Sequence, residues 1–173
     1  MINLTREEIL QLEGVELNRV IADKLGIHPI SKEKDVVSDM LRCPSDTWEF
    51  LDADGHSFGE VFAPSEEAAW MWAWEGDYDC GTTDLPAWAW NAQDAIELCH
   101  LVVHMLKEMF GSEHADFCAV WDNKKTCRTS MTWEIGETEL GEVVEATNLP
   151  LALARLALLV LYHEEKTDDE VVP

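Results

Sequence analysis

Two histidines and three cysteines are the residues best suited to metal chemistry. His100 and His104 are four residues apart, which places both on one face of a predicted helix, and Cys99 is adjacent. Cys118 and Cys127 fall on a hairpin predicted to pack near that helix. Imidazole and thiolate are zinc ligands, so a mixed Cys and His site is one interpretation. Because the chain has no CxxC or HExxH spacing and free Cys is commonly a core residue, we expect buried thiols and no metal or other cofactor.

Nucleophilic catalysis is a second interpretation of the same side chains. Cys99 with His114 or His163 would be enough for a thiol nucleophile, but nearly any chain with five Cys and six His permits such a pair. The sequence has no Gly-rich phosphate loop and no nucleophile elbow. We therefore expect a protein that is not an enzyme.

A third group, Asp52, Asp54 and Gly55, resembles the start of a calcium loop. With Gly55 at the sixth loop position, however, Val61 occupies the place of the bidentate Glu. Aromatic and apolar residues flank the group at 47–51 and 57–62, and Asp and Gly favour tight turns. The pattern therefore predicts a β-hairpin turn.

Acidic and tryptophan residues gather in one part of the chain. From Cys43 to Leu106 there is no Lys or Arg, whereas thirteen Asp and Glu and six of the eight Trp lie there; the net charge is −23. Such a surface repels nucleic acid and anionic membranes and attracts basic proteins. Trp beside acids is typical of an interface anchor, with a core position as the alternative. The candidate partner-binding residues are Glu66, Glu67, Trp70, Trp72, Trp74, Glu75, Asp77, Asp79 and Asp84.

The N-terminal elements are predicted to be helices. Thr5 and Glu8 form a capping box that starts the first helix, Gly14 can break it, and Gly26 stops it. The segment 32–42 is charged with a small apolar face and predicts a short helix. Ser65 starts another element, in which Trp70, Trp72 and Trp74 fit either a strand with one Trp face or a helix.

The C-terminal elements alternate between helix and sheet. Residues 91–110 predict the central helix, 115–121 and 126–135 predict a hairpin, and 141–146 predict a third strand. Residues 149–162 predict a strongly apolar helix, followed by an acidic tail expected to fray.

Several of these segments resemble the phage ABA-sandwich domain family, which consists of small phage and prophage proteins of largely unknown function. The resemblance lies in Trp90–Leu98, the following hairpin, Glu145–Leu159, and the N-terminal segments Leu4–Leu10, Glu16–Asn18 and Ile21–Lys24. Here Trp90–Asp94 replaces the common Tyr-Ser-Thr-Asp helix entry, and 48–81 has no counterpart. The resemblance implies a phage accessory protein and supplies no catalytic residues.

Together these patterns predict an α+β fold with a small antiparallel sheet packed with helices in a sandwich-like arrangement. We expect a single domain, 1–173, made of N-terminal helices (1–42), an acidic Trp-rich insertion (43–90), a helix-hairpin-strand-helix core (91–164) and an acidic tail (165–173). No apolar run is long enough to span a membrane, no secretory signal is evident, and five irregularly spaced Cys fit no disulfide framework. A cytoplasmic location is expected.

The expected function is inhibition by binding. A phage-encoded acidic protein that binds a basic host protein, such as a CRISPR or restriction component, would act as an anti-CRISPR or antirestriction DNA mimic, without binding nucleic acid itself. One alternative is a binder of a nucleotide signal, with Trp stacking and Lys124, Lys125 and Arg128 meeting phosphates. Another is an acidic phage structural or assembly factor. The oligomeric state stays open.

Overall fold

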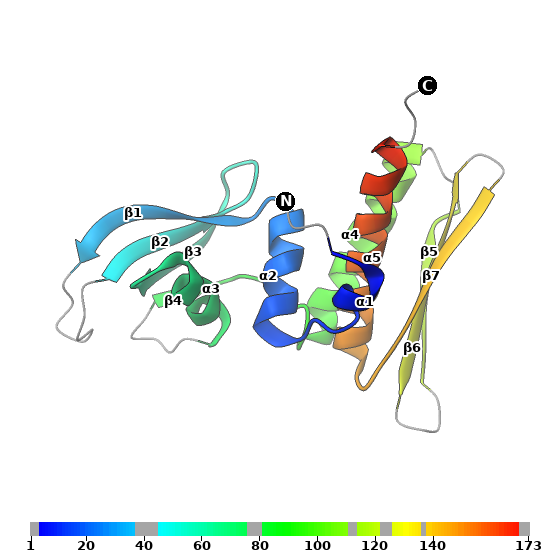
Figure 1. Cartoon of the computed structure of the whole chain (residues 1–173), viewed down its shortest axis with the longest axis horizontal. Helices are drawn as coiled ribbons and strands as arrows, with labels where there is room; N and C mark the ends of the chain where they lie inside the picture. Colours follow the sequence, from blue (N-terminus) through cyan, green and yellow to red (C-terminus); the bar gives the residue numbers. More distant parts are fainter. Residues whose placement is uncertain are drawn as a thin grey trace. The chain divides into compact units, whose positions relative to one another are not determined.

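The computed structural model describes residues 4–36, 45–75, 81–110, 114–121, 126–135 and 138–169. The chain divides into two compact units, one formed by 1–17 with 87–173 and the other by 18–86 (Figure 1). Each unit combines helices with its own antiparallel sheet, which confirms the predicted α+β class. The second unit begins well before residue 43, where the sequence predicted the insertion to start.

The first unit contains a three-stranded sheet and three helices of its own. The helices are α1 (Arg6–Ile9), α4 (Ala92–Phe110) and α5 (Leu149–Asp169), and the strands are β5 (Asp116–Trp121), β6 (Cys127–Ile135) and β7 (Thr138–Ala146), in the order β5-β6-β7. The predicted hairpin and third strand are confirmed, although β7 begins three residues before the predicted Gly141. All strand pairs are antiparallel.

Helix α5 forms the centre of the first unit. Every residue from Leu151 to Tyr162 is buried, because α4, β6, β7 and α1 all pack against this helix (Figure 1). A helix that is apolar on all sides needs such complete cover. The sequence assigned the central position to 91–110, and this was wrong: α4 leaves Leu101 and Met109 exposed. Helix α5 also runs to Asp169, beyond its predicted end at Tyr162.

The N-terminal turn follows the predicted capping chemistry. The Thr5 amide donates to the Glu8 carboxylate (2.7 Å), and the Glu8 amide donates to the Thr5 hydroxyl (3.2 Å). The pKa of Glu8 is lowered, first by the bond from the Thr5 amide to its carboxylate and then by a bond from the Thr5 hydroxyl (2.8 Å). Helix α2 (Gly14–Lys24) begins at Gly14, whose φ of 55° suits glycine. The predicted break at Gly14 is therefore confirmed. Helix α2 begins in the first unit and ends in the second.

The second unit is built on a four-stranded antiparallel sheet with order β1-β2-β3-β4. Its elements are β1 (His28–Val36), β2 (Ser45–Leu51), β3 (Ser57–Ala63), α3 (Glu66–Glu75) and β4 (Gly81–Thr83). The predicted hairpin at 47–62 is confirmed as β2 and β3. Helix α3 packs on β3 and β4, with Phe50, Val61 and Trp70 in the core.

Strand β1 replaces a predicted helix. Residues 32–36 of the predicted helix 32–42 lie in β1, and the rest of it falls outside the described residues. Pro29 pairs with Phe50 and Ile30 with Glu49 of β2. Within 32–36, Glu33 pairs with Thr47 and Val36 with Ser45. Pairing with β2 decides this conformation, and the local charge pattern contains no information about that pairing.

In the described part of the chain, no helix combines the length and the apolar character needed to cross a membrane.

Candidate protein-binding surface

Helix α3 resolves the choice between strand and helix for the Trp-rich segment. Ser65 caps it: its hydroxyl accepts the Ala68 amide (3.2 Å) and its carbonyl accepts the Ala69 amide (2.9 Å). Glu66 and Glu67 lie in the first turn, where negative charge complements the helix dipole. The segment is therefore a helix with its acidic residues favourably placed at the N-terminal end.

Trp70 belongs to the core of the second unit. Its side chain is 4% exposed, and its ring meets Phe50 edge-to-face with centroids 5.0 Å apart. It also stacks on Trp74 at 5.6 Å, and the Arg19 guanidinium lies 5.9 Å from its ring centroid. Trp70 thus occupies the core position that the sequence left as the alternative to an interface anchor, because the ring is enclosed by residues of its own unit.

Two side-chain hydrogen bonds hold the end of α3. The Trp74 indole donates to the Pro86 carbonyl (3.2 Å), and the Thr83 hydroxyl donates to the Ala73 carbonyl (2.6 Å). The Thr83 bond satisfies a carbonyl that lacks a partner within the helix. Trp74 is half-buried and stacked, so its role is to fix α3 against the segment that follows β4.

The opposite side of α3 faces solvent. Glu67, Met71 and Glu75 are four residues apart and form one line along the helix, with Trp72 beside it. The two glutamates are exposed, Met71 is 45% exposed, and Trp72 is half-buried. We call these four residues the α3 outer face. Sequence reasoning missed Met71, whose position follows from helical spacing once the strand is excluded.

Further acidic residues extend this surface. Glu66 is exposed at the start of α3. Asp84 is exposed and follows β4, and its amide donates to the Phe58 carbonyl (2.7 Å). Asp77 and Asp79 lie outside the described residues.

Two acids on the sheet of the second unit are already paired with one lysine. Lys32 donates to Glu49 (2.8 Å) and to Glu60 (2.7 Å). The pKa of Lys32 is raised, with the bond to Glu49 the largest cause, and the pKa of Glu49 is lowered, chiefly by Lys32. Among the described residues, by contrast, no ion pair involves Glu66, Glu67, Glu75 or Asp84. Helix α3 also has no basic residue in its last turn. These four carboxylates are therefore open to cations from another molecule.

No family model matches the chain, and no curated protein sequence does. The resemblance to the phage ABA-sandwich family therefore stays a prediction, and the roles of the residues rest on geometry and charge.

The Cys and His residues considered as zinc ligands form no group of three with metal-ligand spacing in the described part of the chain. Cys99 is buried and its thiol donates to the Leu153 carbonyl (3.6 Å). Burial raises the pKa of Cys99 to about 12, so the thiol stays protonated and is a poor nucleophile. His100 packs edge-to-face on Phe117 (5.0 Å), and His104 lies at the surface beside Glu108 (3.4 Å).

One group with metal-ligand spacing occurs among the described residues, namely Asp52, Asp54 and His56. It lies in the turn between β2 and β3. One Asp52 oxygen accepts the Asp54 amide (3.0 Å) and the His56 amide (2.8 Å), and the other lies 3.2 Å from His56 Nδ1. The carboxylate is thus engaged in closing the hairpin.

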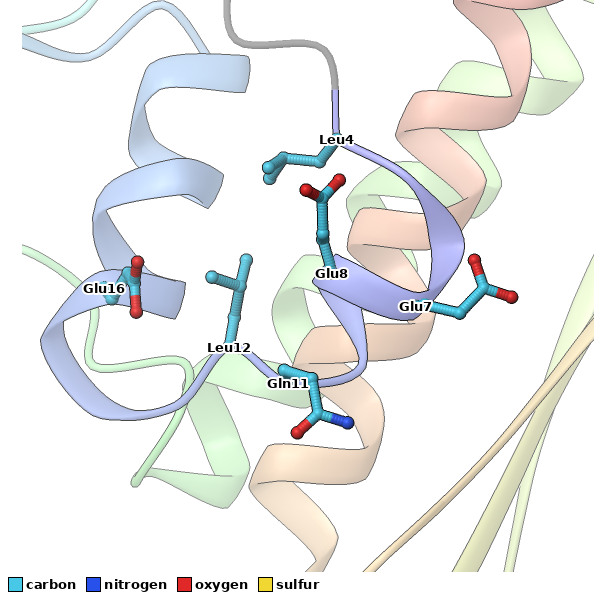
Figure 2. A pocket seen from close by; sticks show the side chains of 6 residues that line it. All are labelled: Leu4, Glu7, Glu8, Gln11, Leu12 and Glu16. Carbon is cyan, nitrogen blue, oxygen red and sulfur yellow. The ribbon is translucent and has the colours of Figure 1, made fainter.

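A cavity of about 420 Å³ lies between α1 and the first turn of α2. Figure 2 shows Leu4, Glu8 and Leu12 gathered there, with Glu16 on α2; Glu7 and Gln11 complete its lining. Glu8 is bound in the capping box. The polar groups of its lining are three carboxylates and the amide of Gln11.

The cationic cluster of the nucleotide-binding alternative is described only in part. Arg128 is exposed and lies 3.9 Å from Glu145. Lys124 and Lys125 lie outside the described residues. Arg128 therefore faces a carboxylate of its own unit.

Proposed function

We propose that this chain is a non-catalytic, phage-encoded inhibitor that acts in the host cytoplasm. It binds a basic, nucleic-acid-handling defence protein of the kind targeted by anti-CRISPR or antirestriction proteins. The contact surface is the α3 outer face together with Glu66 and Asp84. The observation that carries the proposal is the set of exposed carboxylates around Met71 and Trp72 with no ion pair among the described residues.

The surface combines two kinds of contact. The carboxylates would occupy positions where the partner otherwise binds phosphates, and charge complementarity of this kind raises the association rate and selects the partner. Met71 and Trp72 supply apolar area at the centre, where interface energy concentrates. A surface of this composition suits a basic groove.

The last turn of α3 adds an electrostatic reason for a basic partner. Glu75 lies at the C-terminal end of the helix, where the dipole disfavours negative charge, and no basic residue of that turn offsets it. An Arg or Lys of a partner placed there would interact favourably with both the carboxylate and the helix end.

A pair of double variants tests the proposal. Glu67→Lys with Glu75→Lys reverses charge on the α3 outer face. Glu134→Lys with Glu139→Lys makes the same change in net charge at two exposed, cross-strand residues of the first unit. The partner is captured from nuclease-treated host lysate by tagged parent protein at low salt, identified, and purified.

Dissociation constants are then measured across a salt series. We expect the α3 variant to weaken binding at least about tenfold and to flatten its salt dependence, while the control changes affinity by less than about threefold. Double-stranded DNA should compete with the parent protein for the partner. Equal effects of the two variants, or binding that does not respond to salt, would contradict a role for α3.

A further inference from the structure

The two sheets present four edge strands, β1 and β4 in one sheet and β5 and β7 in the other. An edge strand carries backbone N–H and C=O groups that can pair with another chain. Proteins usually block such edges with proline, bulges, charges, short strands or covering side chains. The four edges of this protein differ in this respect.

Three of the edges carry such features. Strand β1 contains Pro29 and two irregularities in its register with β2, and β4 is three residues long. On β7, Arg6 donates to the Val143 carbonyl (3.1 Å) and contacts Glu142 (3.4 Å). Exposed Glu139 and Glu145 add charge to that strand.

Strand β5 has only one of these features, the charge of exposed Asp116 at its first position. Its register with β6 is regular from Asp116 opposite Thr132 to Trp121 opposite Cys127, and it contains no Pro, Gly, Lys or Arg. Cys118, Ala119 and Val120 are consecutive and all exposed, Val120 at 57%. Because successive side chains point to opposite faces, both faces of the strand are open there. Within the described residues, β5 pairs with β6 alone.

The charge distribution favours a second copy of the chain as the occupant. Residues 107–128, which include β5, contain four basic and four acidic residues, whereas the whole chain carries −23. Two copies repel each other over most of their surfaces, and the repulsion is weakest around this neutral segment. A partner other than a second copy, if strongly basic or strongly acidic, would find no complementary net charge on residues 107–128.

We propose that β5 pairs antiparallel with β5 of a second copy, which joins two three-stranded sheets into one of six strands. The interface is isologous, with its twofold axis at Cys118 or Ala119. With the axis at Cys118, Asp116 lies opposite Val120 of the second copy, so no like charges face each other across the strands. With the axis at Ala119, Asp116 would be set against Asp122, the residue that follows β5 in the sequence, and this register is less favourable. Main-chain hydrogen bonds and the contacts of Cys118, Ala119 and Val120 hold the dimer.

This dimer uses the first unit and does not depend on the α3 outer face. The affinity of the dimer should also respond to salt in the opposite direction from the affinity of the α3 outer face for a basic partner. Salt screens repulsion between two acidic copies and strengthens the dimer, whereas it weakens an acidic surface bound to a basic partner. Failure of one proposal therefore leaves the other testable.

The test is sedimentation velocity of the full chain over a concentration series, from about 1 to about 300 µM, at low and high salt. Val120→Lys places charge on the open edge. Val143→Lys is the matched control, since Val143 is also exposed on the same sheet but on β7. We expect a reversible dimer that tightens with salt, at least about tenfold weaker in Val120→Lys and unchanged in Val143→Lys.

Cross-linking locates the contact. In both registers the two Cys118 side chains lie within about 8 Å of each other, so a short bifunctional thiol reagent should link the parent dimer and leave Cys118→Ser unlinked. A monomer at every concentration and salt, or a dimer that survives Val120→Lys, overturns the proposal. If the chain is a monomer under all conditions, the β5 edge would be open to pairing with a strand of another protein.

Discussion

Arg155 joins two parts of the first unit through its guanidinium. It lies on the buried helix α5, and its Nε and Nη2 donate to the Leu12 carbonyl at 3.0 and 2.9 Å. Its Nη2 also lies 3.3 Å from the Glu13 carboxylate. Leu12 lies in the connection between α1 and α2, so this one side chain holds that connection against helix α5.

Replacing this residue should be costly. Arg155→Met keeps the length of the side chain but leaves the Leu12 carbonyl without its donors, and we expect a loss of about 2 to 3 kcal/mol in the free energy of unfolding. Urea denaturation monitored by Trp fluorescence measures it. Arg128→Met, which removes only an exposed pair with Glu145, should cost less than about 0.5 kcal/mol. Similar losses in both variants would contradict the role given to Arg155.

At the scale of elements, the β2–β3 hairpin is closed by an acidic residue at its turn. The pKa of Asp52 is lowered from its ordinary value of 3.8, first by the backbone hydrogen bond from His56. Because the folded-state pKa lies below the unfolded one, the ionised carboxylate stabilises the fold above pH 4 or so. That stabilisation is lost as the pH falls through the folded-state pKa.

The variant Asp52→Asn tests this linkage. Asn can still accept the two turn amides through Oδ1 but cannot ionise. We expect the variant to be less stable than the parent at about pH 7, and the difference to shrink as the pH falls below about 4. Urea unfolding over that range provides the measurement. If the two stability curves stay parallel at low pH, the lowered pKa does not contribute to folding.

For the whole molecule, charge is the dominant physical feature. A net charge of −23 on 173 residues makes the compact state repel itself. Paired acids such as Glu49, held by Lys32, offset only part of this repulsion. Screening of the remaining charges should therefore stabilise the folded chain.

We expect Tm to rise by about 3 °C or more between about 0.05 M and about 0.5 M NaCl. Sodium chloride is chosen because sulfate would also strengthen apolar burial. Glu134→Lys with Glu139→Lys makes the net charge less negative and should reduce the rise in Tm. Thermal unfolding followed by circular dichroism measures both, and a Tm that falls with NaCl would contradict net self-repulsion.

Local signals predicted most elements. The signals that predicted these elements each lie within a short stretch of sequence. The structure shows the capping box of Thr5 and Glu8, the break at Gly14, the Asp52 turn and the helix 149–162. The acids of α3 were also visible as charges in the sequence. The sequence did not show that these acids have no ion pair, because ion pairing depends on which carboxylates a lysine such as Lys32 reaches across the sheet.

By itself, the sequence determined the α+β class, the strongly negative charge and the positions of most helices and hairpins, since these depend on composition and short-range periodicity. Tertiary structure alone decided that 32–36 form a strand, that α5 is central, and that Trp70 lies in the core while Met71 faces solvent. The physical reason is that strand pairing and burial depend on contacts between residues far apart in the chain, and local patterns carry no record of those contacts.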